Sequence, residues 1–128
     1  MNTLITHNIK VSVRSFYKSE YSKPNHMHFV HAYKIIIENK AEHPIQVMTR
    51  HWKIFDSVEP IKNVDGEGIV GEKPIIEPGG KFEYVSGCHL KSEIGYMRGF
   101  YNVLNLVTKE MLIIAIPKFT LQAGYRLN

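Results

Sequence analysis

The 128-residue chain has the length of one domain, and its 44% hydrophobic and 11% aromatic residues are enough to build a buried core. Its formal net charge of +4 is modest and its basic residues are scattered. We therefore expect neither a disordered chain nor a nucleic-acid-binding surface.

The sequence also bounds the compartment. The single cysteine, Cys88, excludes an intramolecular disulfide. The first ten residues lack the continuous apolar stretch of a signal peptide, and the longest apolar run, residues 111–117, is too short to span a bilayer. We expect a cytoplasmic protein without a membrane anchor.

Seven segments have the alternation or composition of β-strands, and turn residues separate them. In chain order, they are residues 9–14, 29–38, 45–56, 74–77, 82–86, 95–107 and 110–117. In the clearest one, the odd positions from Phe29 to Ile37 should face the core. Imperfect alternation in residues 45–56 predicts a bulge or burial on both faces, and residues 58–73 are predicted as a loop. This pattern predicts an all-β fold, an antiparallel β-sandwich of about seven strands in a single domain, residues 1–128.

The order of several motifs resembles one family over nearly the whole chain. They are residues 33–39, 50–54, 64–74, 78–87, 95–101 and 116–119. In these motifs the chain resembles the ApaG family, which implies an immunoglobulin-like, fibronectin type III-like sandwich. The resemblance also implies protein binding, because related domains occur in F-box proteins and in a polymerase delta-interacting protein. Family members are linked to divalent-cation homeostasis. His31 departs from the pattern, since the family more often has an aromatic residue such as Phe there.

Three glycines, Gly66, Gly68 and Gly71, match the letters of a dinucleotide-binding fingerprint. That fingerprint needs a helix after the last glycine, so that the helix amides hold the pyrophosphate. Pro74 and Pro78 exclude a helix here. We interpret the segment as a loop whose glycines permit positive φ in tight turns. A backbone site for an anion is the alternative.

Other combinations of reactive residues lack the geometry for chemistry. His28 and His31 should point to opposite faces of one strand, and His26 with His28 falls short of the four ligands that zinc prefers. Cys88 and His89 are neighbours on an extended chain and point apart, so they do not form a nucleophile and its base. We expect no metal, no cofactor and no enzymatic activity.

The last candidate is a binding surface. Tyr96, Arg98 and Phe100 alternate with residues that suit the core, so an arginine flanked by two aromatic rings should face outward, as in binding hot spots. A second buried layer is the alternative. The first strand of the last hairpin commonly lies beside the third strand of such a sandwich, which would bring Arg50 or His51 to the same surface.

Two functions follow from these observations. The first is a non-enzymatic protein-interaction module with a protein partner. The alternative is a small-ligand binder that holds a phosphate, a nucleotide or a divalent cation near the glycine loop.

Overall fold

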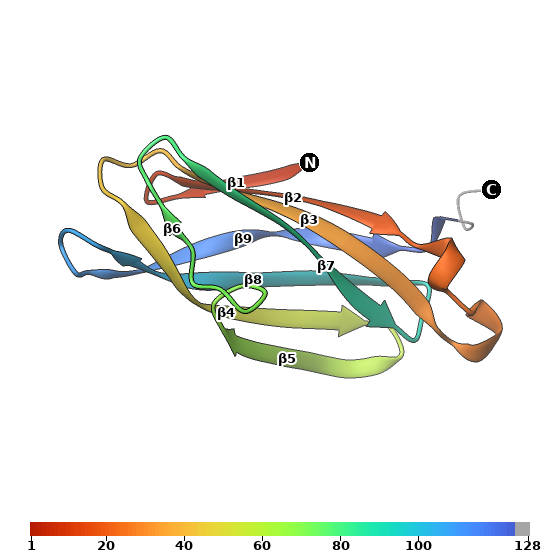
Figure 1. Ribbon diagram of the computed structural model, residues 1–128. Helices are drawn as coiled ribbons and strands as arrows, with labels where there is room; N and C mark the ends of the chain where they lie inside the picture. Colours follow the sequence, from red (N-terminus) through yellow and green to blue (C-terminus); the bar gives the residue numbers. More distant parts are fainter. Residues whose placement is uncertain (125–128) are drawn as a thin grey trace.

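Two antiparallel sheets pack face to face in the computed structural model, which describes residues 1–124 (Figure 1). The end of the predicted domain, residues 125–128, lies outside the described residues. The first sheet has the order β1 (Asn2–Thr6), β2 (Ile9–Tyr17), β3 (Phe29–Asn39) and β7 (Lys81–Leu90). The second has the order β5 (Glu59–Glu67), β4 (Ile45–Asp56), β8 (Ile94–Asn105) and β9 (Met111–Gln122), and β6 (Ile75–Ile76) also pairs with β4. The prediction of an all-β antiparallel sandwich is confirmed.

Short 3₁₀ turns, η1 (Ser19–Tyr21) and η2 (Pro24–His26), connect β2 to β3. Among residues 1–124 there is no helix with the length and apolar character needed to cross a bilayer.

Nine strands form in the described residues, two more than the seven predicted. The additional ones are β1 and β5, and the prediction of a loop over residues 58–73 is wrong for the part that forms β5. Both strands lie at sheet edges and leave most of their side chains exposed. Their sequences therefore lack a clear buried face, and pairing with β2 and β4 defines them instead.

The core lies between the two sheets, and β3 contributes to it at every second position. Its odd positions, from Phe29 through Ile37, are all buried, which confirms the predicted orientation. The Tyr33 ring contacts the rings of Trp52 and Phe119 at centroid distances of 5.5 and 5.4 Å, and thereby joins the first sheet to the second.

Two irregularities decide which side chains face outward from the second sheet. The β4–β8 register shifts between Val47 and Thr49, as the imperfect alternation predicted. The β8–β9 register shifts between Met97 and Gly99. At Gly99 a Cβ atom would lie 2.1 Å from the His51 carbonyl oxygen, so only glycine fits this close approach of β8 to β4.

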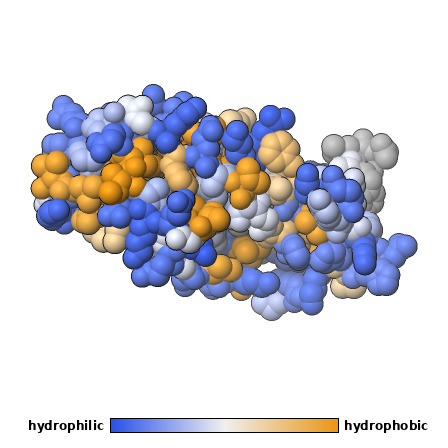
Figure 2. Space-filling model, viewed as in Figure 1, coloured by the Kyte–Doolittle hydropathy of each residue, from blue (hydrophilic) through white to orange (hydrophobic). Residues whose placement is uncertain are grey.

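The β8–β9 hairpin forms one end of the molecule. It turns through Lys109, which has a positive φ of 65°. Hydrophobic residues gather at this end of the molecule in Figure 2. The hydrophobic residues Val107 and Met111 near the turn are exposed.

Candidate functional site

The outer face of β4 and β8 brings aromatic and basic side chains together in register. The cross-strand pairs are His51 with Phe100, Lys53 with Arg98, and Phe55 with Tyr96. These six residues are called the β4–β8 face below. His51 stacks on Phe100 at 4.6 Å between ring centroids and Phe55 stacks on Tyr96 at 4.7 Å, with interplanar angles of 21° and 11°. Two aromatic stacks therefore flank a central pair of cations.

The structure places the predicted binding residues as follows. Tyr96 and Phe100 are half-buried and Arg98 is exposed, so no second layer from residues 1–124 covers them. His51 joins them from β4, as predicted. Arg50 does not, because it lies on the opposite face of β4. Its guanidinium donates hydrogen bonds to backbone carbonyls at the end of β5 and in the loop that follows, at 3.0 and 3.1 Å.

A hydrogen-bond network fixes the His51 ring. Its Nδ1 lies 2.7 Å from an Asp65 carboxylate oxygen, so that Nδ1 carries the proton and donates it. Its Nε2 lies 2.9 Å from the Thr49 hydroxyl and 3.1 Å from the Asn102 amide nitrogen. The Asn102 amide also donates to the Thr49 hydroxyl at 2.9 Å. The imidazole is thus held as a flat surface beside Phe100.

The hydrogen bonds connect a carboxylate, Asp65, to an imidazole, His51, and then to a hydroxyl, Thr49. Acyl-transfer triads connect an acid, a base and a hydroxyl in the same order. Catalysis of that kind also needs backbone or side-chain donors aimed at a developing oxyanion. The central strand β4 pairs with β5 on one side and β8 on the other, so its amides around His51 are engaged in the two ladders. These β4 amides are therefore not free to act as oxyanion donors.

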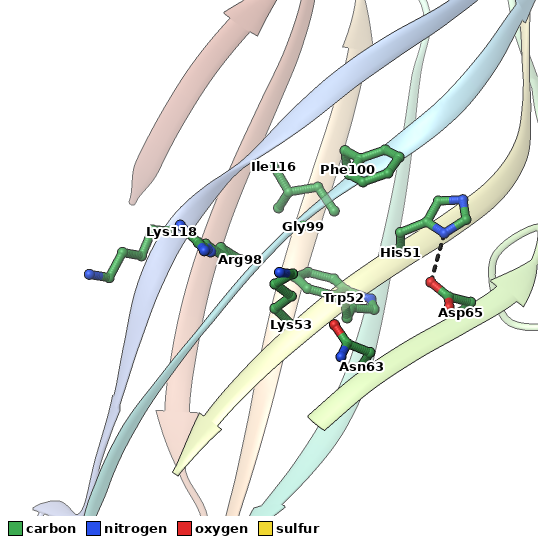
Figure 3. Close-up of a pocket in the computed structure, with 10 residues that line it drawn as sticks. All are labelled: His51, Trp52, Lys53, Asn63, Asp65, Arg98, Gly99, Phe100, Ile116 and Lys118. Carbon is green, nitrogen blue, oxygen red and sulfur yellow. Dashed lines mark hydrogen bonds and ion pairs between the residues drawn. The ribbon is translucent and has the colours of Figure 1, made fainter. Parts of the chain in front are cut away.

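A pocket of about 410 Å³ opens on this face (Figure 3). Three cationic side chains, Lys53, Arg98 and Lys118, line it from β4, β8 and β9, together with the apolar side chains of Phe100 and Ile116. None of the three cations forms an ion pair within residues 1–124.

Sequence reasoning missed two of these cations. Lys53 lies two residues after His51 on one strand, so the alternation of the strand could have predicted that both face outward. Lys118 reaches the face through the bulge between β8 and β9, and its ammonium lies 4.1 Å above the Tyr96 ring. No periodicity in the sequence indicates that contact.

The glycine loop is used for turns. Gly68 and Gly71 have φ of +60° and +79°, as predicted, whereas Gly66 lies within β5 and has no positive φ. The amides of Gly68, Ile69 and Glu72 all donate to backbone carbonyls. The chain then continues into the extended strand β6 rather than into a helix. A backbone anion site would have to form without those three donors.

The remaining reactive residues do not converge. Burial raises the pKa of the Cys88 thiol to about 11, which keeps it protonated and unreactive at neutral pH. His89 points to the opposite side of β7 and packs against His28 at 4.9 Å. His31 faces the core. Among residues 1–124, no three histidine, cysteine or acidic side chains are grouped as metal ligands.

These features define the class of protein: an antiparallel β-sandwich domain with an aromatic and basic sheet face. The chain belongs to the ApaG family, because the model of the ApaG domain matches residues 19–105. It is 38% identical to the protein ApaG of Paramagnetospirillum magneticum over the full length of both. It is 45% identical to that of Bordetella pertussis over 75% of this chain and 73% of the relative.

A solved structure agrees with this assignment. The crystal structure of a Bordetella pertussis protein named ApaA superimposes with a TM-score of 0.88 at 38% identity, and the match covers 94% of this chain and 98% of that one.

Proposed function

We propose that this protein is a non-enzymatic protein-interaction module that binds its partner on the β4–β8 face. The observation that carries the proposal is the pair of aromatic stacks on either side of Lys53 and Arg98. Stacked rings offer a large contact area at a low entropic cost, and a guanidinium adds directed hydrogen bonds. His51 is already oriented by its hydrogen bonds, so its side chain loses little further conformational freedom when a partner binds.

A binding role is favoured over catalysis by the chemistry of the candidate groups. The Cys88 thiol is buried with a raised pKa, and the β4 amides around His51 are engaged in the two strand ladders. The alternative function, a ligand site at the glycine loop, has less support because amides of Gly68, Ile69 and Glu72 are engaged in hydrogen bonds. A fibronectin type III-like strand arrangement and a cytoplasmic location belong to the same proposal.

Site-specific photo-crosslinking tests this proposal. The photoreactive residue benzoylphenylalanine would replace Phe100 on the β4–β8 face or, as a control, the exposed Val85 on the other sheet. We expect a discrete cross-linked protein from the Phe100 position alone. Excess unmodified protein should compete with that cross-link, whereas a Phe100→Ala protein should compete poorly. The same cross-links from both positions, or none from Phe100, would refute the proposed docking surface.

A further inference from the structure

We infer that the pocket beside the β4–β8 face binds an acidic peptide segment of the partner, with carboxylates held by Lys53, Arg98 and Lys118. This inference rests on the proposed function and specifies the chemistry of the partner.

The first observation is an excess of positive charge in one place. Lys53 lies directly opposite Arg98 in the β4–β8 ladder, and Lys118 lines the same pocket from β9. Like charges in directly opposed positions repel each other. An anion between them removes that repulsion and gains three favourable interactions.

The second observation is that none of the three pocket cations forms an ion pair with a carboxylate of residues 1–124. Five other lysines are paired with a glutamate: Lys10 with Glu38, Lys18 with Glu20, Lys73 with Glu67, Lys81 with Glu83, and Lys91 with Glu59. The acidic side chain that lines the pocket, Asp65, is hydrogen-bonded to His51. Within the described chain, the three pocket cations are thus left for an external anion.

The third observation is the shape and chemistry of the lining. Arg98 is exposed, so its planar fork is available to bind a carboxylate through two parallel hydrogen bonds. The contact of Lys118 with the Tyr96 ring holds its ammonium at the edge of the β4–β8 face. Phe100 and Ile116 give the pocket an apolar lining, which suits a hydrophobic side chain next to the carboxylates. A peptide with acidic and aromatic residues satisfies both parts, and inorganic phosphate satisfies only the charged part.

The other sheet provides a matched control. Arg14 and Lys34 are also direct cross-strand partners, on β2 and β3, and they belong to the sheet that does not carry the β4–β8 face. Replacing both by glutamate changes the net charge of the protein by the same amount as replacing Lys53 and Arg98 does. A general attraction between a basic protein and an acidic peptide would respond equally to the two double variants.

The experiment is an NMR titration of the ¹⁵N-labelled protein with a hexapeptide of alternating glutamate and phenylalanine. A second hexapeptide with lysine in place of glutamate, and inorganic phosphate, serve as comparison ligands. We expect the acidic peptide to shift the amide signals of β4, β8 and β9 around the pocket. The combined Lys53→Glu and Arg98→Glu variant should bind it at least about tenfold more weakly, since two charged contacts become repulsive. The Arg14→Glu and Lys34→Glu variant should bind nearly as well as the parent.

Three results would overturn the inference: no shifts at millimolar acidic peptide, equal losses in the two double variants, or tighter binding of phosphate than of peptide. The amide spectrum of each variant also reports whether it is folded. Cross-linking through the Phe100 position would persist if only this inference failed, so the two proposals fail separately.

Discussion

Lys53 and Arg98 face each other as direct partners across the ladder of β4 and β8. Because side chains alternate along a β-strand, the Lys53 ammonium and the Arg98 guanidinium both lie on the outer side of the sheet, between two aromatic stacks. A pair of like charges in this position costs the free protein stability. In the proposed complex, a carboxylate of the partner offsets that cost.

Removing one of these charges should therefore stabilise the free protein. We expect Lys53→Gln to raise the free energy of unfolding by about 0.2–1 kcal/mol in low salt, the range for cross-strand pairs. The gain should shrink in 1 M salt, where surface charges are screened. Urea denaturation measures both values, and Lys40→Gln, at an exposed turn residue, is the control. A loss of stability at Lys53, or an equal gain at Lys40, would contradict the repulsion.

The core assignment of β3 is tested at two adjacent positions. Ile35 is fully buried between the sheets, whereas Ile36 lies on the other face of the same strand and is only half-buried. We expect Ile35→Ala to lower the free energy of unfolding by about 2–5 kcal/mol, because it removes transfer energy and leaves a cavity. Ile36→Ala should cost clearly less in the same denaturation experiment. Equal costs would mean that the strand does not separate the two environments.

The glycine loop yields a comparison of two similar substitutions. At Gly68 a Cβ atom would lie 2.0 Å from the Glu72 carbonyl oxygen, whereas at Gly71 nothing lies within 4 Å. Both have positive φ, so Gly71→Ala should cost about 1–2 kcal/mol from the backbone alone. Gly68→Ala should cost more, since the loop must also shift. Thermal unfolding ranks the two variants, and the reverse order would contradict the loop geometry.

His31 should make the protein sensitive to mild acid. Burial lowers the pKa of its imidazole from 6.5 to about 4, and its Nε2 has no hydrogen-bond partner within residues 1–124. Between these two pH values the unfolded chain binds a proton that the folded protein excludes, so stability falls as the pH falls. The full loss near pH 4 is about 3 kcal/mol relative to neutral pH.

The substitution His31→Phe isolates this effect. The free energy of unfolding of the variant should decrease less between pH 7 and pH 5 than that of the parent. Asp56 does not interfere with this measurement. Burial alone would raise the pKa of its carboxyl, but hydrogen bonds from Ser92 and Lys91 outweigh burial and lower that pKa below 3.8. Its contribution to stability is lost only at still lower pH. Parallel decreases in parent and variant would assign the acid sensitivity to other groups.

The alternation of buried and exposed residues was sufficient to predict the inner strands. In β3 every second residue packs on the opposite sheet, so the sequence reports the burial directly. The edge strand β5 could not be predicted in this way, because its backbone pairing to β4, not a buried face, determines its structure.

The candidate site could likewise be predicted only in part from the sequence. Tyr96, Arg98 and Phe100 were predictable because they alternate on a single strand. Neighbouring strand residues point to opposite faces, so the bulge after Val47 decides that His51 rather than Arg50 faces outward. The approach of Lys118 to Tyr96 depends on the bulge before Gly99. A bulge shifts the alternation by one residue, and its position follows from contacts between strands.

The most direct test of the docking surface uses the partner identified by cross-linking. Calorimetry measures the affinity of that partner for an Arg98→Ala variant, and the melting temperature of the variant is measured beside it. Arg14→Ala, at an exposed arginine of the other sheet, is the control. We predict that Arg98→Ala weakens binding by about tenfold or more, as expected for a hot-spot arginine, with a melting temperature close to that of the parent. Unchanged affinity, or affinity and melting temperature that fall together, would contradict a binding role for this face.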